Sequence, residues 1–238
     1  MAGHSKWANI KHKKERADAK KGKVISRCAK EIISAVKQGG PDPKSNTKLR
    51  LALQKAKGAN VPSDVIERNI KKAASADQAD FTELTYELYG HGGVGIIVDA
   101  MTDNKNRTAS DLRIATNKKG GTIASPGSVA FNFDRKGILQ INQDQGDEES
   151  LFMQASEAGA EDFDTTEEGF LVVTSPELLY EVKEKLEAAG VAVQDESLEM
   201  LPKTTVACDQ ETKEANLGLI DFLENLDDVD AVFHNMED

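Results

Sequence analysis

The 238-residue chain is 39% hydrophobic and 30% charged, contains 5% aromatic residues, and has a formal net charge of −11. This length allows one large core or two to three small ones, and the few aromatic residues favour small cores of aliphatic side chains. No apolar run approaches the roughly 18 residues of a membrane span, and charge begins at Lys6, which excludes a signal-peptide core. Two cysteines far apart, Cys28 and Cys208, favour reduced thiols. We therefore expect a cytoplasmic protein with no membrane partner.

Positive charge is concentrated in the first third of the chain. Residues 1–75 hold 19 Lys/Arg and 6 Asp/Glu, whereas residues 138–238 hold 4 and 27. Such asymmetry favours a polyanion-binding region attached to an acidic body, and the alternative is a solvated Lys-rich surface. If five phosphates are neutralised, log K should fall by about 3.5–4.5 for each decade of salt.

The opening stretch "GHSKWANIKHKKERADAKKGK" (3–23) contains eight Lys/Arg, two acids and the single tryptophan. Trp7 could stack on an unpaired base or anchor this segment to the rest of the protein, and the sequence leaves both open. His4 and His12 have no cysteine or acid beside them at ligand spacing, so no metal site is expected.

Helical periodicity follows over residues 24–39 and 45–57, and a third helix begins near 62–63. The three helices would form a small bundle with basic outer faces. A helix-turn-helix DNA reader is possible, but no recognition helix stands out. The expected nucleic-acid contacts are Lys6, Trp7, Lys11, Lys13, Lys14, Arg16, Lys20, Lys21, Lys23, Lys48, Arg50, Lys55, Lys57, Arg68, Lys71 and Lys72.

The stretch "YGHGGVG" matches the dinucleotide-binding pattern G-x-G-x-x-G letter for letter. That pattern binds phosphate only between a strand and the N-terminus of a helix. Here a strand at 84–89 is followed by the apolar, β-branched residues 94–100, which predict a second strand. We therefore predict a hairpin whose glycines supply the turn, with His91 at its surface.

The next stretch, "TDNKNRTASDLRIATNKKGG", predicts a helix. Thr108 and Asp111 have capping-box spacing, and Gly120 ends the helix. The preceding loop, 102–107, would then present polar groups at the end of a strand, where a ligand contact is reasonable. Possible secondary contacts are Asn104, Lys105, Asn106 and Arg107.

The remaining elements predict two α/β domains. Their order after residue 137 is β-α-β-β-α-β, which is ferredoxin-like, and the last helix and strand complete the unit that begins at 84. The prediction is an α+β protein with an N-terminal three-helix domain followed by two ferredoxin-like α/β domains, the third inserted within the second. The boundaries are 1–78, 79–130 with 203–238, and 131–202. The elements expected after residue 137 are strands 138–142, 161–165, 169–174, 191–199, 204–207 and 229–233 and helices 147–158, 176–189 and 212–225.

No catalytic arrangement is visible. The acids of the third block fall mostly at helix starts and loops, where caps and solubility place them, and no His, Cys or Lys cluster accompanies them. We therefore expect no catalytic residue, no cofactor, no small-molecule substrate and no enzymatic activity.

Four stretches, "MAGHSKWANIKHKK", "ELYGHGGVGIIV", "TDNKNRTASDLR" and "GSVAFNFDRKG", together resemble the YebC/PmpR family, which includes the mitochondrial translational activator of cytochrome c oxidase. The resemblance covers nearly the whole chain and implies three domains. It also implies a DNA-binding transcriptional regulator or, as for some members, a translation factor that relieves ribosome stalling on proline runs. It names no catalytic residue.

The expected function is accordingly that of a non-enzymatic, nucleic-acid-binding regulator of gene expression. DNA-binding transcriptional regulation is the first form, and a ribosome-associated factor on rRNA or tRNA is the alternative. A Lys-rich segment with no evident recognition helix suits readout of phosphates and shape, as in RNA recognition. A protein adaptor that uses the acidic face would bind no nucleic acid.

Overall fold

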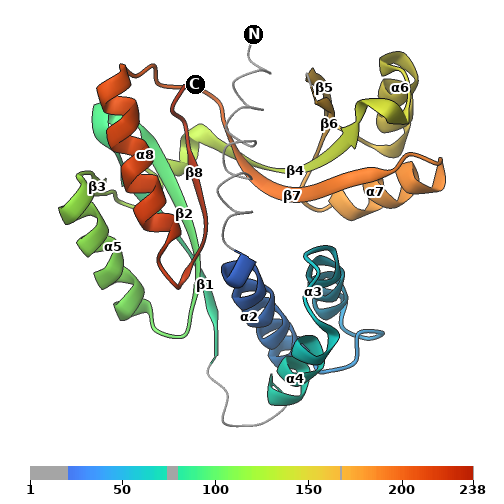
Figure 1. Cartoon of the computed structure of the whole chain (residues 1–238), viewed down its shortest axis with the longest axis horizontal. Helices are drawn as coiled ribbons and strands as arrows, with labels where there is room; N and C mark the ends of the chain where they lie inside the picture. Colours follow the sequence, from blue (N-terminus) through green and yellow to red (C-terminus); the bar gives the residue numbers. More distant parts are fainter. Residues whose placement is uncertain (1–20, 74–79, 167, 238) are drawn as a thin grey trace.

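The computed structural model describes residues 21–73, 80–166 and 168–237, which form a three-helix region and two four-stranded antiparallel sheets with helices (Figure 1). The α+β class expected from the sequence is confirmed, including the position of the third domain between strands of the second in chain order. In the described part of the chain, no helix is long and apolar enough to span a membrane.

The three-helix region has its own core, because each helix turns one aliphatic stripe inward. Ile32 from the first helix, Leu49 from the second and Ile66 from the third are all buried in it. The side-chain amide of Asn46 accepts a hydrogen bond from Leu49 N, which caps the second helix. The same amide donates to Ala35 O and so connects the second helix to the first. The helices are α2 (Lys21–Gly39), α3 (Thr47–Gly58) and α4 (Ser63–Ala73).

The second domain is a sheet of order β3-β1-β2-β8 with two helices on one face. Its core joins sheet residues such as Ile96 to Leu112 and Leu219 of the two helices. The first two strands form the predicted hairpin, and a strand, not a helix, follows the glycines. Its elements are β1 (Thr82–Tyr89), η1 (His91–Gly93), β2 (Gly95–Thr102), α5 (Lys105–Lys119), β3 (Thr122–Ile123), α8 (Gln210–Glu224) and β8 (Val229–His234).

Two glycines of the hairpin turn have positive φ, +66° at Gly92 and +80° at Gly93, a conformation that L side chains rarely adopt. The turn is fastened to α8 by Asn216, which is fully buried. Its side chain accepts from His91 N at 2.8 Å and donates to His91 O at 3.1 Å. These glycines therefore serve a tight turn against a helix.

The third domain has the predicted β-α-β-β-α-β order and the sheet order β5-β6-β4-β7, with its two helices against one face. Its two long strands, β4 and β7, extend from the rest of the third domain toward the second domain in Figure 1. Phe133 and Met200 on them pack against the second domain. Its elements are η2 (Ala130–Asn132), β4 (Phe133–Asn142), η3 (Gln143–Gln145), α6 (Glu148–Ala158), β5 (Asp162–Thr166), β6 (Gly169–Thr174), α7 (Leu179–Ala188) and β7 (Val193–Pro202).

The sequence-based start of α5 at Thr108 is wrong. Asn104 is the N-cap, accepting from Asn106 N and Arg107 N at 3.1 Å, so the helix begins at Lys105. Thr108 lies inside the helix, where its hydroxyl donates to Asp228 at 2.9 Å. The expected strand at 204–207 is also absent, because only the bridge between Val206 and Met236 forms there.

Asp228, 5% exposed, joins three parts of the fold. Arg107 donates to both of its carboxylate oxygens, at 2.8 and 2.9 Å, and Thr102 donates at 3.0 Å. Lys30 of α2 approaches the same carboxylate at 3.6 Å. The end of β2, the start of α5 and the three-helix region therefore meet at one buried anion.

We expect Asp228→Asn to lower the free energy of unfolding at pH 7 by roughly 3 kcal/mol, because Arg107 and Lys30 lose the charge that neutralises them. Burial alone would raise the pKa of Asp228, but the bonds from Arg107, Thr108 and Thr102 hold it below its usual value. Such a group stabilises the fold above its unfolded pKa of about 3.9, and this contribution disappears as the pH falls through the folded pKa.

Urea unfolding at pH 7 and at pH 3 measures this effect, and the deficit of the variant should shrink at the lower pH. Asp227→Asn, at the exposed neighbouring side chain, is the control. A deficit of equal size at both pH values would contradict the role assigned to the Asp228 charge.

Candidate nucleic-acid interface

The basic opening segment lies largely outside the described residues. This applies to seven expected contacts, and Lys21 is placed only as the first residue of α2. The described part of the candidate interface is therefore the three-helix region. The seven residues are Lys6, Trp7, Lys11, Lys13, Lys14, Arg16 and Lys20.

One basic face of α2 is turned toward the second domain. Lys23, Arg27 and Lys30 have the spacing i, i+4, i+7, which places them on one side of a helix. Lys23 donates to Glu224 O at the end of α8, and Arg27 donates to Asp230 O at 3.3 Å. Lys30 donates to Asp227 O at 2.7 Å and to Met101 O at 3.1 Å. This face therefore docks the helices onto the second domain by satisfying backbone carbonyls.

A cavity of about 110 Å³ lies beside these contacts, between α2 and β8. Its walls combine apolar groups, among them Val24 and Val229, with the same three cations. Because each cation already donates to a carbonyl, we do not assign phosphate binding to this cavity.

Lys55 on α3 is also used internally. Its ammonium donates to Glu31 at 2.5 Å, and Arg27 donates to the same carboxylate oxygen at 3.1 Å. Burial alone would raise the pKa of Glu31, but Lys55 and Arg27 hold it below its usual value. Lys55 therefore connects α3 to α2, and only part of its side chain, 41%, is exposed.

The outward face of α3 carries Arg50, Gln54 and Lys57, again with the spacing i, i+4, i+7. All three side chains are exposed. Neither Arg50 nor Lys57 forms an ion pair with a carboxylate of residues 21–73, 80–166 or 168–237. This α3 stripe, the set Arg50, Gln54 and Lys57, therefore presents two cations and one amide to solvent.

The other expected contacts on the helices are more dispersed. Lys48 donates to Gln38 at 2.6 Å. Arg68 pairs with Asp64 at 2.8 Å, but both side chains are about 70% exposed, so this pair contributes little. Lys71 and Lys72 are exposed at the end of α4, where their charge suits the helix dipole.

The loop proposed as a secondary contact is mostly structural. Asn104 caps α5, and Arg107 is held by Asp228 and by Asp103 at 2.7 Å. The side chains of Lys105 and Asn106 are exposed in the first turn. Of the four residues, only Lys105 and Asn106 have exposed side chains that neither cap the helix nor pair with a carboxylate in the described part of the chain.

The sequence analysis did not single out Gln54. The signal was present, since positions 50, 54 and 57 share one helical face, but on the helices only Lys and Arg were expected to contact nucleic acid. No group of three or more His, Cys, Asp or Glu side chains that could hold a metal ion occurs within the described ranges.

The different surroundings of Lys55 and Lys57 can be tested by replacing each with methionine, which keeps the aliphatic stem. Lys55→Met should lower the free energy of unfolding by about 1 kcal/mol, because Glu31 keeps only Arg27, and partial solvation limits the effect. Lys57→Met should change it by less than about 0.5 kcal/mol. Urea unfolding measures both, and equal losses would contradict the assignment.

Comparison with known proteins identifies relatives over the whole chain. Residues 5–76 match the family model described as the TACO1/YebC protein N-terminal domain, and residues 81–236 match that of the TACO1/YebC second and third domain. A "probable transcriptional regulatory protein" of Protochlamydia amoebophila is 64% identical over 100% of this chain and 97% of its own length. One from Chlamydia pneumoniae is 62% identical over 99% of this chain and 100% of its own.

A solved structure also matches, that of the conserved hypothetical protein Aq1575 from Aquifex aeolicus. It has a TM-score of 0.81 and 43% sequence identity, and the match covers 92% of this chain and 91% of that one. The family resemblance noted from four sequence stretches is thus confirmed by the models, the relatives and the fold together. The chain belongs to the TACO1/YebC family.

Proposed function

We propose that this protein is a non-enzymatic, nucleic-acid-binding regulator of gene expression, and that its basic N-terminal third binds phosphates. The observation that carries the proposal is the α3 stripe, where Arg50 and Lys57 face solvent, whereas Lys23, Arg27 and Lys30 of α2 bind backbone carbonyls of the second domain. Relatives about 60% identical are named as probable transcriptional regulatory proteins, which supports regulation of transcription. Binding through such cations is driven by counterion release and depends on salt.

Binding to duplex DNA is the first form of the proposal. Gln54 lies between Arg50 and Lys57 on one helical face, and a Gln amide can pair bidentately with adenine in the major groove. In this arrangement the two cations would contact phosphates and set the register, while the amide would read a base. Gln54→Ala should then reduce the preference between sequences more than the overall affinity.

Binding to folded RNA at the ribosome is the second candidate. The exposed contacts on the helices are mainly Lys and Arg, which recognise phosphates and shape without reading sequence. In this form the protein would act in translation on rRNA or tRNA. Gln54→Ala should then leave relative affinities for different sequences unchanged.

The charge reversal Arg50→Glu/Lys57→Glu tests phosphate binding by the stripe. Two lost phosphate contacts should reduce the slope of log K against log salt by about 1.8 on duplex DNA and by about 1.4 on single strands. Titrations with duplex DNA and with rRNA fragments at several salt concentrations measure the slope. Arg113→Glu is the control, because Arg113 is an exposed cation on α5 of the second domain.

The titrations separate the outcomes. Tighter binding of duplex DNA than of rRNA favours transcription, and the reverse order, with cosedimentation with ribosomes, favours translation. An unchanged slope in the double variant would remove α3 from the interface. Failure of the unmodified protein to bind either polymer would contradict the proposed function.

A further inference from the structure

The loop between β3 and β4 presents a phenylalanine to solvent. Phe131, on η2, is 71% exposed, whereas its neighbour Phe133 is 5% exposed and belongs to the core. Exposed apolar area of this kind does not stabilise the fold. The exposed position of this ring is instead set by the bonds that hold the loop on either side of it.

A buried carboxylate fixes the loop on the side before Phe131. Glu87 of β1, 8% exposed, accepts from the backbone of Gly127 at 2.5 Å, Val129 at 2.6 Å and Ala130 at 2.7 Å. Burial alone would raise the pKa of Glu87, but these three N–H groups hold it below its usual value. Tyr89 adds a bond from its hydroxyl to Ser128 O at 2.7 Å.

A second network fixes the chain after Phe131. Asn132 accepts from Thr204 N at 3.0 Å and from Thr204 Oγ1 at 2.7 Å, and it donates to Thr204 O at 2.9 Å. Lys203 N donates to Asn132 O at 2.8 Å. The backbone is thus held on both sides of Phe131 by partners from distant parts of the chain. A ligand that contacts this ring would not have to order the loop, which lowers the cost of binding.

The residues that hold the backbone directly after Phe131 are polar. Asn132 and Thr204 bond to each other there, and the ammonium of Lys203 donates to Phe131 O at 3.0 Å. Lys203 also pairs with Asp134 at 3.1 Å, but both side chains are about half exposed, so this pair is weak and leaves positive charge beside the loop. Among the described residues, Phe131 has no aromatic ring contact.

A protein interface would be expected to surround such a ring with a buried apolar patch. Phe131, with hydrogen-bonding groups directly after it in the chain and the ammonium of Lys203 on its backbone carbonyl, instead matches the way in which proteins hold an unpaired base. We propose that Phe131 is a stacking platform for an unpaired nucleobase, which would be a second nucleic-acid contact outside the basic N-terminal third. This inference rests on the proposed function.

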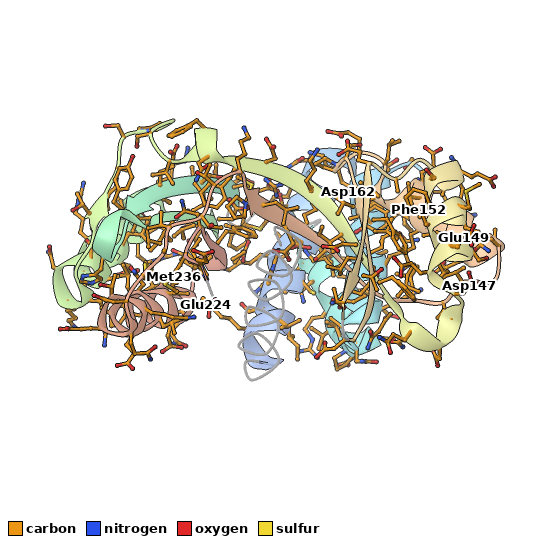
Figure 2. All side chains as sticks on the ribbon, turned by 90° about the horizontal axis from the view of Figure 1, so that it is seen from above. Asp147, Glu149, Phe152, Asp162, Glu224 and Met236 are labelled. Carbon is orange, nitrogen blue, oxygen red and sulfur yellow. The ribbon has the colours of Figure 1, made fainter. Side chains whose placement is uncertain are left out.

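The third domain supplies a matched control. Phe152 on α6 is also exposed, at 49%, but it packs edge-on against Phe163 with ring centroids 5.8 Å apart. Figure 2 shows Phe152 in the same region as Asp147, Glu149 and Asp162, at the end of the molecule opposite Glu224. These carboxylates would repel phosphates, so this ring should not contact nucleic acid.

The test compares Phe131→Ala with Phe152→Ala on RNA and DNA hairpins that carry 2-aminopurine in an unpaired loop, and on fully paired duplexes. Loss of one stacked base, worth about 1–3 kcal/mol, should weaken hairpin binding by Phe131→Ala roughly 5- to 150-fold. The salt slope should stay unchanged, because no phosphate contact is removed. Phe131→Tyr should bind as the unmodified protein does, and Phe152→Ala should have no effect.

The fluorescence of 2-aminopurine reports stacking directly. It should be quenched by the unmodified protein and by Phe131→Tyr, and not by Phe131→Ala at saturating concentration. If the unmodified protein binds hairpins but Phe131→Ala binds them equally well, the stacking role is wrong and the proposed function stands. If a protein partner depends on Phe131 while hairpin binding does not, the ring is a protein contact and this inference is likewise overturned.

Discussion

The arrangement of the protein depends on the neutralisation of Asp228. A carboxylate that is 5% exposed is costly unless cations and hydrogen-bond donors surround it. Arg107 comes from α5, Thr102 from the end of β2 and Lys30 from α2, so the charge can be balanced only when all three elements are in place. The position of the three-helix region on the sheet is therefore tied to the interior of the second domain.

Lysine and arginine have two different roles in the N-terminal third, and the difference follows from which helical face carries them. On α2, positions 23, 27 and 30 meet backbone carbonyls of the second domain. On α3, positions 50 and 57 have the same relative spacing but face solvent. A count of charges therefore overstates the surface available for phosphates, because several cations hold the domains together.

The sequence predicts the elements well where the signal is local. Aliphatic spacing locates α2 and α3 within a few residues, and the β-branched run after the glycines identifies β2. The sequence does not reveal partners that are distant in the chain. The sequence alone indicates a loop cation at Arg107 and an ordinary strand acid at Glu87. In the fold, Arg107 binds Asp228, and Glu87 binds the backbone of the β3–β4 loop. The start of α5 was predicted from the spacing of Thr108 and Asp111, whereas the Asn104 side chain caps the helix and Thr108 lies inside it, bonded to Asp228. For the candidate interface, charge alone does not separate the cations docked on the second domain from those open to solvent, and that distinction requires the fold.

The insertion of the third domain imposes an order on how the chain becomes structured during synthesis. Domains generally fold as units, and the stretch from β4 to β7 is continuous, so it contains everything its sheet needs. The hairpin of β1 and β2 emerges earlier, yet the neighbour of β2 on its outer side is β8, near the C-terminus. The carbonyl groups that receive Lys23, Arg27 and Lys30 also include those of residues 224, 227 and 230. A nascent chain thus carries an uncovered strand edge and undocked basic helices until β8 leaves the ribosome, and premature termination before β8 leaves both unprotected.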